Sequence, residues 1–199
     1  SNGNPHVCWY GSHVRLPEED VNPLSLVDEI IASGDVASYC HPFGVGGATP
    51  DPNGQATILE SVAPELLDQR MFGCHALEVG YRQRGGASLS THESLWDACS
   101  RRGIFLTGIG ANDNHTGMNW DQNINNFVSW LWVEDVTEPQ LLDALHSGHV
   151  YFGDPVRFAG RLDIVTEAKE HMGMVTQPTG NETALTVIGH DLPQGSSLE

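Results

Sequence analysis

The segment 36–42 reads Val36-Ala37-Ser38-Tyr39-Cys40-His41-Pro42, a short and mostly apolar run that ends in a histidine followed by a proline. It comes directly after a stretch with apolar residues at helical spacing. That stretch predicts a helix with Asn22 as its N-cap, Pro23 in its first turn and Gly34 near its end. A helix that leads into a buried strand is the repeating unit of α/β folds.

The same alternation continues to about residue 153. Further helices are expected from near Pro64, from the capping box Ser90-Thr91-His92-Glu93 to Gly103, and from Thr137 to Gly148. The segment 127–133 is apolar on both faces, as in a covered parallel sheet. The chain therefore predicts an α/β domain over residues 1–155, with strands at 6–10, 36–40, 76–79, 104–107, 127–133 and 150–152.

After residue 155 the pattern changes. The segments 158–165 and 184–188 alternate between apolar and polar residues, with glycine, proline and asparagine between them. We therefore expect residues 156–199 to form a small β-rich appendage with a loose tail.

The composition excludes some functions. The 199 residues carry a net charge of −17, whereas nucleic acids and anionic membranes attract basic surfaces. No apolar run approaches the ~20 residues of a membrane span. The four cysteines are widely spaced, so buried free thiols are expected rather than a disulfide framework. No signal-peptide pattern is present, and the sequence does not predict a compartment.

Polar residues follow three of the predicted strands. His41 follows the first, Arg82 and Arg84 the second, and Asp113 and His115 the third. Active sites of α/β proteins form where the carboxyl ends of strands meet. We therefore expect these side chains to share one site.

Asp113 and His115 are the clearest metal-ligand candidates, because residues two apart in an extended segment point to the same side. Carboxylate and imidazole ligands suit Zn²⁺, Mn²⁺ or Fe²⁺. His41 and His6 are further candidates, and Arg82 and Arg84 could hold an anionic small-molecule substrate. The alternative for each is structural: a turn at 112–115, a hydrogen-bonded core histidine, or a solvated arginine loop.

Glu78 lies among apolar residues in the middle of a predicted strand. A carboxylate in that place either accepts a hydrogen bond that orients a ligand or pairs with an arginine.

The order of these motifs resembles the polymerase and histidinol phosphatase (PHP) superfamily, closest to its carbaryl-hydrolase-like branch. The resemblance covers about residues 6–153 and implies a distorted β/α barrel with a two- or three-metal centre. The motifs that carry it are Tyr39-Cys40-His41-Pro42, Ala76-Leu77-Glu78-Val79, Leu95-Trp96-Asp97 with Arg101-Arg102-Gly103, Gly110-Ala111-Asn112-Asp113-Asn114-His115, and the spaced series Leu142, Leu145, Gly148 and Tyr151.

The resemblance implies metal ligation by His6, His41, Asp113 and His115. The early His-x-His of the family does not occur in this sequence. The resemblance therefore implies either the C-terminal part of such a domain, hence a partial barrel, or a domain that has lost its metals.

The activity implied is metal-dependent hydrolysis, with Asp113, His115 and His41 as catalytic residues. A phosphate ester is the first expected substrate, and a carbamate, ester or amide is the alternative. A non-catalytic domain that binds a carbohydrate or a protein is the rival reading, and an open barrel edge would favour a homodimer.

Overall fold

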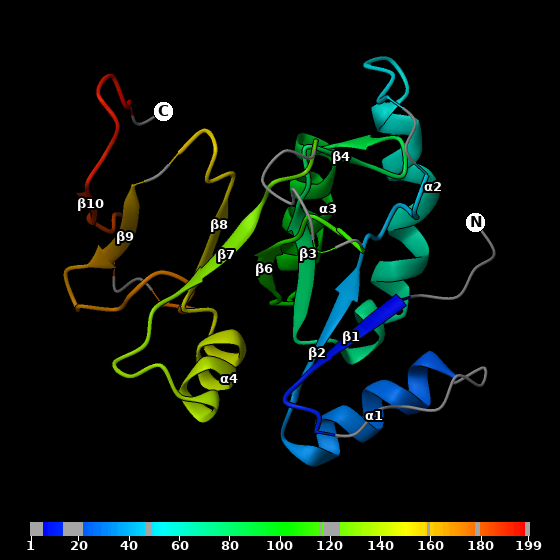
Figure 1. Cartoon of the computed structure of the whole chain (residues 1–199), viewed down its shortest axis with the longest axis horizontal. Coiled ribbons are helices and arrows are strands. Elements are labelled where there is room, and N and C mark those ends of the chain that lie inside the picture. The colour runs from blue at the N-terminus through cyan, green and yellow to red at the C-terminus, as the bar shows by residue number, and fades with distance from the viewer. Residues whose placement is uncertain are drawn as a thin grey trace.

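A four-stranded sheet forms the centre of the computed structural model, which describes residues 6–13, 22–46, 49–115, 117, 124–158, 160–177 and 180–197. Strand β1 lies antiparallel to β2, whereas β2, β3 and β6 run parallel to one another (Figure 1). The strands, in their order across the sheet, are β1 (His6–Tyr10), β2 (Val36–Cys40), β3 (Ala76–Gly80) and β6 (Thr107–Gly110).

Three helices pack against one face of this sheet, namely α1 (Pro23–Ser33), α2 (Gln55–Asp68) and α3 (Leu89–Arg101). Every second strand residue points toward them, because side chains alternate across a strand. A short 3₁₀ segment, η1 (Arg70–Gly73), connects α2 to β3. The buried cluster between sheet and helices includes Ala37, Tyr39, Leu77, Val79, Val27, Ile30, Leu66 and Leu95.

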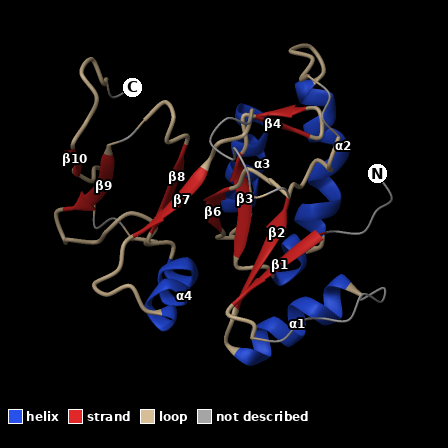
Figure 2. Ribbon diagram, in the orientation of Figure 1, coloured by secondary structure: helices blue, strands red, loops and turns tan. Residues whose placement is uncertain are grey.

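Among the described residues, the opposite face is covered at one end. There α4 (Glu138–Ser147) and the antiparallel pair β7 (Val128–Leu131) and β8 (Val150–Gly153) contact the sheet. Figure 2 shows β7 and β8 on the side of the sheet away from α2. The second buried cluster includes Val36 and Ala76, the first residues of β2 and β3, so the cover lies where these strands begin.

The remaining strands form two small pairs. One is the hairpin of β4 (Gln83–Arg84) and β5 (Ala87–Ser88), and the other is the antiparallel pair of β9 (Arg161–Thr166) and β10 (Leu185–His190). In Figure 1 the β9–β10 pair lies at the far side of β7 and β8 from the central sheet. None of the helices in the described ranges is long and apolar enough to cross a bilayer.

Several predicted boundaries are confirmed. Asn22 Oδ1 accepts a hydrogen bond from Leu24 N (3.0 Å), and Gly34 ends α1 in the left-handed conformation with φ 83°. Gly148 ends α4 in the same way with φ 78°. The strands at 6–10, 36–40 and 76–79 are also present.

Other boundaries differ from the prediction. Helix α2 begins at Gln55 rather than near Pro64, which lies inside it. Pro64 and Glu60 are exposed, so water can satisfy the Glu60 carbonyl that loses its helical partner. Helix α3 has Ser88 rather than Ser90 as its N-cap. The Gln55 side chain explains this shift, because its Oε1 accepts from Ser88 N (2.8 Å) and Thr91 Oγ1 (2.6 Å).

Two strand predictions are wrong in part. Strand β6 begins at Thr107 rather than at residue 104, because the ladder to β3 starts with the pair Ala76 and Thr107. Strand β7 pairs antiparallel with β8, so the segment 127–133 does not join a parallel sheet.

The α/β class is confirmed, whereas the barrel is not. The described strands form open sheets and do not close into a barrel. The edge strand β1 has β2 as its partner in the central sheet, and β6 forms the other edge.

Candidate functional site

Polar side chains share the face of the central sheet that α1, α2 and α3 do not cover. They alternate along the strands with the residues that contact these helices. The ladder places His6 opposite Cys40 and Cys8 opposite Ser38. We call this set the polar face; its members are His6, Cys8, Ser38, Cys40 and Glu78.

His6, at the start of β1, and His41, directly after the end of β2, are in direct contact. His6 Nδ1 lies 3.0 Å from His41 Nε2, and the two rings meet edge to face. The antiparallel pairing explains the contact, because β1 begins where β2 ends. Partial burial lowers the pKa of His41; the charge of Glu78 opposes this shift, whereas His6 and Arg84 add to it. The neutral imidazole that this favours is the form that binds metal ions.

His41 also has an unusual backbone. Its φ of 28° lies in the left-handed region, which non-glycine residues seldom adopt. Asp113, another predicted metal ligand, also has a left-handed backbone, with φ 52°. Such conformations cluster at functional sites, where the surrounding structure holds them in place.

Glu78 holds the His41 backbone in that conformation. Its Oε2 accepts hydrogen bonds from His41 N (2.7 Å) and from the hydroxyl of Tyr81 (2.5 Å). Burial and the charge of Glu78 raise the pKa of the fully buried Tyr81, so its hydroxyl stays a donor. Glu78 therefore acts as the acceptor that orients a candidate ligand.

Cys8 and Cys40 form a second contact on the polar face. The Cys40 thiol donates to Cys8 Sγ at 3.1 Å, which lowers the pKa of Cys8. Together with Glu78 they form a group whose ligand atoms lie within 4.8 Å of one another. Thiolate and carboxylate donors would suit zinc. The expectation of buried thiols is confirmed for Cys40, Cys74 and Cys99 and is wrong for Cys8, which is exposed.

Asp113, His115 and Arg84 form a neighbouring group. The Arg84 guanidinium makes an ion pair with the Asp113 carboxylate. His115 Nδ1 lies 3.6 Å from Asp113 Oδ1, and the His115 side chain is 83% exposed. Arg82 does not join this group, because it faces Asp154 at 3.6 Å.

The four predicted ligands thus fall into two pairs, His6 with His41 and Asp113 with His115. Within the part of the chain that the structure describes, they do not form one group of mutually close ligand atoms. Arg84 connects the pairs, because it contacts Asp113 and its charge acts on His41.

Sequence reasoning missed the roles of Cys8, Cys40 and Tyr81. A signal was present for the cysteines, since Cys8 lies two residues after His6 and Cys40 precedes His41. Two strands with such spacing bring both cysteines to the face that carries His6 once they pair. For Tyr81 the sequence offers no comparable signal.

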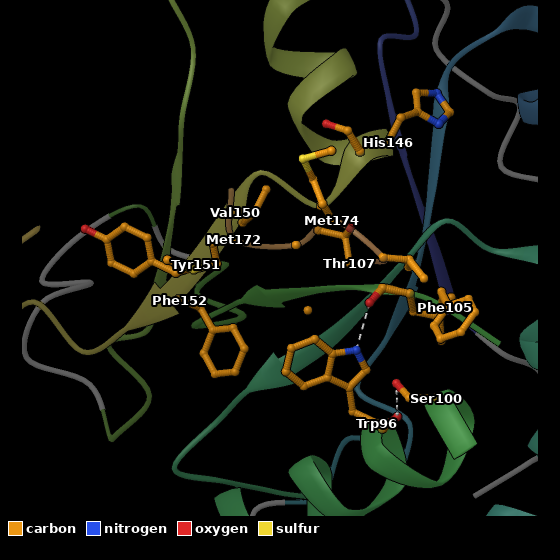
Figure 3. A pocket seen from close by; sticks show the side chains of 16 residues that line it. Trp96, Ser100, Phe105, Thr107, His146, Val150, Tyr151, Phe152, Met172 and Met174 are labelled. Carbon is orange, nitrogen blue, oxygen red and sulfur yellow. Dashed lines mark hydrogen bonds between the residues drawn. The ribbon is translucent and has the colours of Figure 1, made fainter. Parts of the chain in front are cut away.

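An apolar cavity of about 630 Å³ lies away from these residues, between α3, β8 and the segment 172–175 (Figure 3). Two of its polar groups are already engaged: Trp96 Nε1 donates to Leu106 O (2.8 Å), and Thr107 Oγ1 donates to Leu145 O (2.6 Å). The cavity contains none of the predicted catalytic residues. It therefore adds nothing to the candidate site.

Comparison with protein-family models, with curated proteins and with solved structures gives no match to this chain. The likeness to the PHP superfamily therefore rests on the order of its motifs.

Proposed function

We propose that the chain is a metal-dependent hydrolase that acts on an anionic ester, with a phosphate ester as the first candidate. The observation that carries this proposal is the 3.0 Å contact between His6 Nδ1 and His41 Nε2. The motif order that resembles the PHP superfamily supports the same function.

The spacing of the two imidazoles suits one divalent ion. Two nitrogens bound to the same tetrahedral zinc, each about 2.0 Å from it, lie about 3.3 Å apart. The observed 3.0 Å is close to this value, so a small rotation of either ring would let both bind. Glu78 keeps His41 in place through its hydrogen bond to the backbone. Zn²⁺, Mn²⁺ and Fe²⁺ all accept imidazole nitrogen together with carboxylate oxygen.

A bound ion of this kind would lower the pKa of a water molecule and polarise the ester oxygen. The residues of the chain supply binding and proton transfer. Arg84 binds the negative group of the substrate, because its guanidinium forms two parallel hydrogen bonds to such groups. The substrate then replaces Asp113 on Arg84. Asp113 is thereby released either to complete the ligand set with His115 or to take a proton from the attacking water.

The test begins with metal content. The chain is stripped with a chelator, dialysed against Zn²⁺ or Mn²⁺ and analysed for bound metal. We expect at least one ion per chain, and a His41→Ala variant should bind it at least ~10-fold more weakly. His190→Ala is the matched control, because it removes an exposed imidazole from β10 and should bind metal like the unaltered chain.

Turnover is then measured with p-nitrophenyl phosphate and with an aryl carbamate, which separates the phosphoesterase from the carbamate alternative. Activity that needs metal, His41 and Arg84 supports the proposal. A metal-loaded chain that turns over neither substrate counts against a hydrolase. Metal binding that survives His6→Ala and His41→Ala together would show that the histidine pair is not the site.

A further inference from the structure

Two thiols of unequal accessibility lie in contact at the edge of the central sheet. Cys8 Sγ and Cys40 Sγ are 3.1 Å apart. Cys8 is exposed, whereas Cys40 is buried with 5% of its surface accessible. The pair lies on neighbouring strands and not in a sequence motif, so it exists only once β1 and β2 have paired.

We propose that Cys8 and Cys40 are a redox modification site, at which a hydroperoxide oxidises Cys8 and Cys40 then closes a reversible disulfide. The proposal does not depend on the hydrolase function. It would apply equally to a chain that binds no metal.

The two sulfur atoms are already in van der Waals contact. A disulfide requires about 2.05 Å between the sulfurs, so the present contact must shorten by about 1 Å. Cys8 pairs with Ser38 and Cys40 pairs with His6, so the cysteines are diagonal neighbours in the ladder, and closure also needs a shift of the edge strand β1. Cys74 and Cys99 offer no such contact; both are buried in the cluster between the sheet and the helices.

The chemistry proceeds in two balanced steps. The Cys8 sulfur attacks the hydroperoxide, the O–O bond breaks, and the products are the sulfenic acid of Cys8 and an alcohol, or water when the oxidant is hydrogen peroxide. The Cys40 sulfur then attacks the Cys8 sulfur, the S–O bond breaks, and one water leaves as the disulfide forms. The peroxide is the oxidant, and a dithiol reverses the change.

Ser38 provides a reason for the intermediate to form at Cys8. It lies directly opposite Cys8 in the ladder, on the same face. Its hydroxyl is buried and has no hydrogen-bond partner among the described residues. Most buried hydroxyl groups in proteins have a hydrogen-bond partner, so the Ser38 hydroxyl can take up a new one. The sulfenic oxygen would bring an acceptor to this position, next to the thiol that must resolve it.

The experiment uses the full chain, freed of metal by a chelator and fully reduced. A small excess of hydrogen peroxide is added, and free thiols and intact mass are measured under denaturing conditions. We expect two of the four thiols to disappear with the loss of two hydrogens per chain, and dithiothreitol to restore both. Peptide mapping should join the peptides of Cys8 and Cys40.

Variants assign the roles. Cys40→Ser should stop at the sulfenic acid of Cys8, which dimedone traps, and Cys8→Ser should leave Cys40 unmodified. Cys99→Ser is the matched control and should still form the disulfide. The proposal is wrong if the unaltered chain keeps all its thiols, if Cys8 gains oxygen while Cys40 remains free, or if the disulfide joins two chains.

Discussion

The buried histidine of α3 should make the protein sensitive to mild acid. The His92 ring is fully buried between Phe43 and Tyr81. Its Nδ1 donates to Ser88 O (2.8 Å), and its Nε2 has no partner among the described residues. Burial lowers the pKa of His92 from 6.5 to about 4. The folded chain therefore keeps this ring neutral at a pH where the unfolded chain protonates it.

The size of the effect follows from that difference. Above pH 6.5 the ring is neutral in both states, and it contributes no pH dependence. As the pH falls from about 6.5 to about 4, the unfolded state gains a proton that the folded state does not. A shift of about 2.5 units at about 1.4 kcal/mol per unit lowers the free energy of unfolding by about 3 kcal/mol at pH 4.

Urea unfolding of the unaltered chain and of His92→Phe, measured at several pH values between 7.5 and 4, isolates this contribution. Both proteins share every carboxylate and every other histidine, so their difference reports His92. The variant can be less stable at pH 7.5, because it loses the hydrogen bond to Ser88, but its stability should fall less toward pH 4. Parallel pH profiles would refute the argument that the ring is buried and neutral.

Three further predictions concern stability at pH 7, each measured by urea unfolding. Leu95→Ala removes a fully buried side chain of α3 and should cost about 2–5 kcal/mol; a cost below 1 kcal/mol would place Leu95 outside the core. Gly80→Ala would bring a Cβ to 2.7 Å from the Gly110 backbone and should cost at least about 1–3 kcal/mol, whereas an unchanged midpoint would contradict the close approach of β3 and β6. Tyr81→Phe deprives Glu78 of a buried donor and should cost about 1–3 kcal/mol; equal stability would mean that the 2.5 Å hydrogen bond is absent.

Local signals predicted the parts of the fold that depend on neighbouring residues. Asn22 and Gly34 mark the two ends of α1, because a side-chain acceptor and a left-handed glycine act within one turn of the helix. Pro64 misled the prediction for α2, since a proline is typical of a first helical turn but is tolerated inside an exposed one. The start of α3 could not be read locally, because Gln55 fixes it from 33 residues away.

The candidate site divides in the same way. Its residue types were visible in the sequence: His6, His41, Asp113 and His115 are candidate ligands by chemistry, and Glu78 is a carboxylate in an apolar strand. Their partners were not visible. Arg84, which was predicted to bind substrate, forms an ion pair with Asp113. Glu78 accepts hydrogen bonds from the backbone N–H of His41 and from the hydroxyl of Tyr81.

The sequence by itself determined the α/β alternation, several of the helix ends and the supply of ligand-type side chains, because periodicity, capping and residue chemistry act over a few positions. Tertiary structure alone decided that β1 runs antiparallel to β2, which puts His6 against His41 and Cys8 against Cys40. It also decided that β7 pairs with β8 in a small open sheet. Strand direction and register depend on contacts between residues far apart in the chain, and no local pattern specifies them.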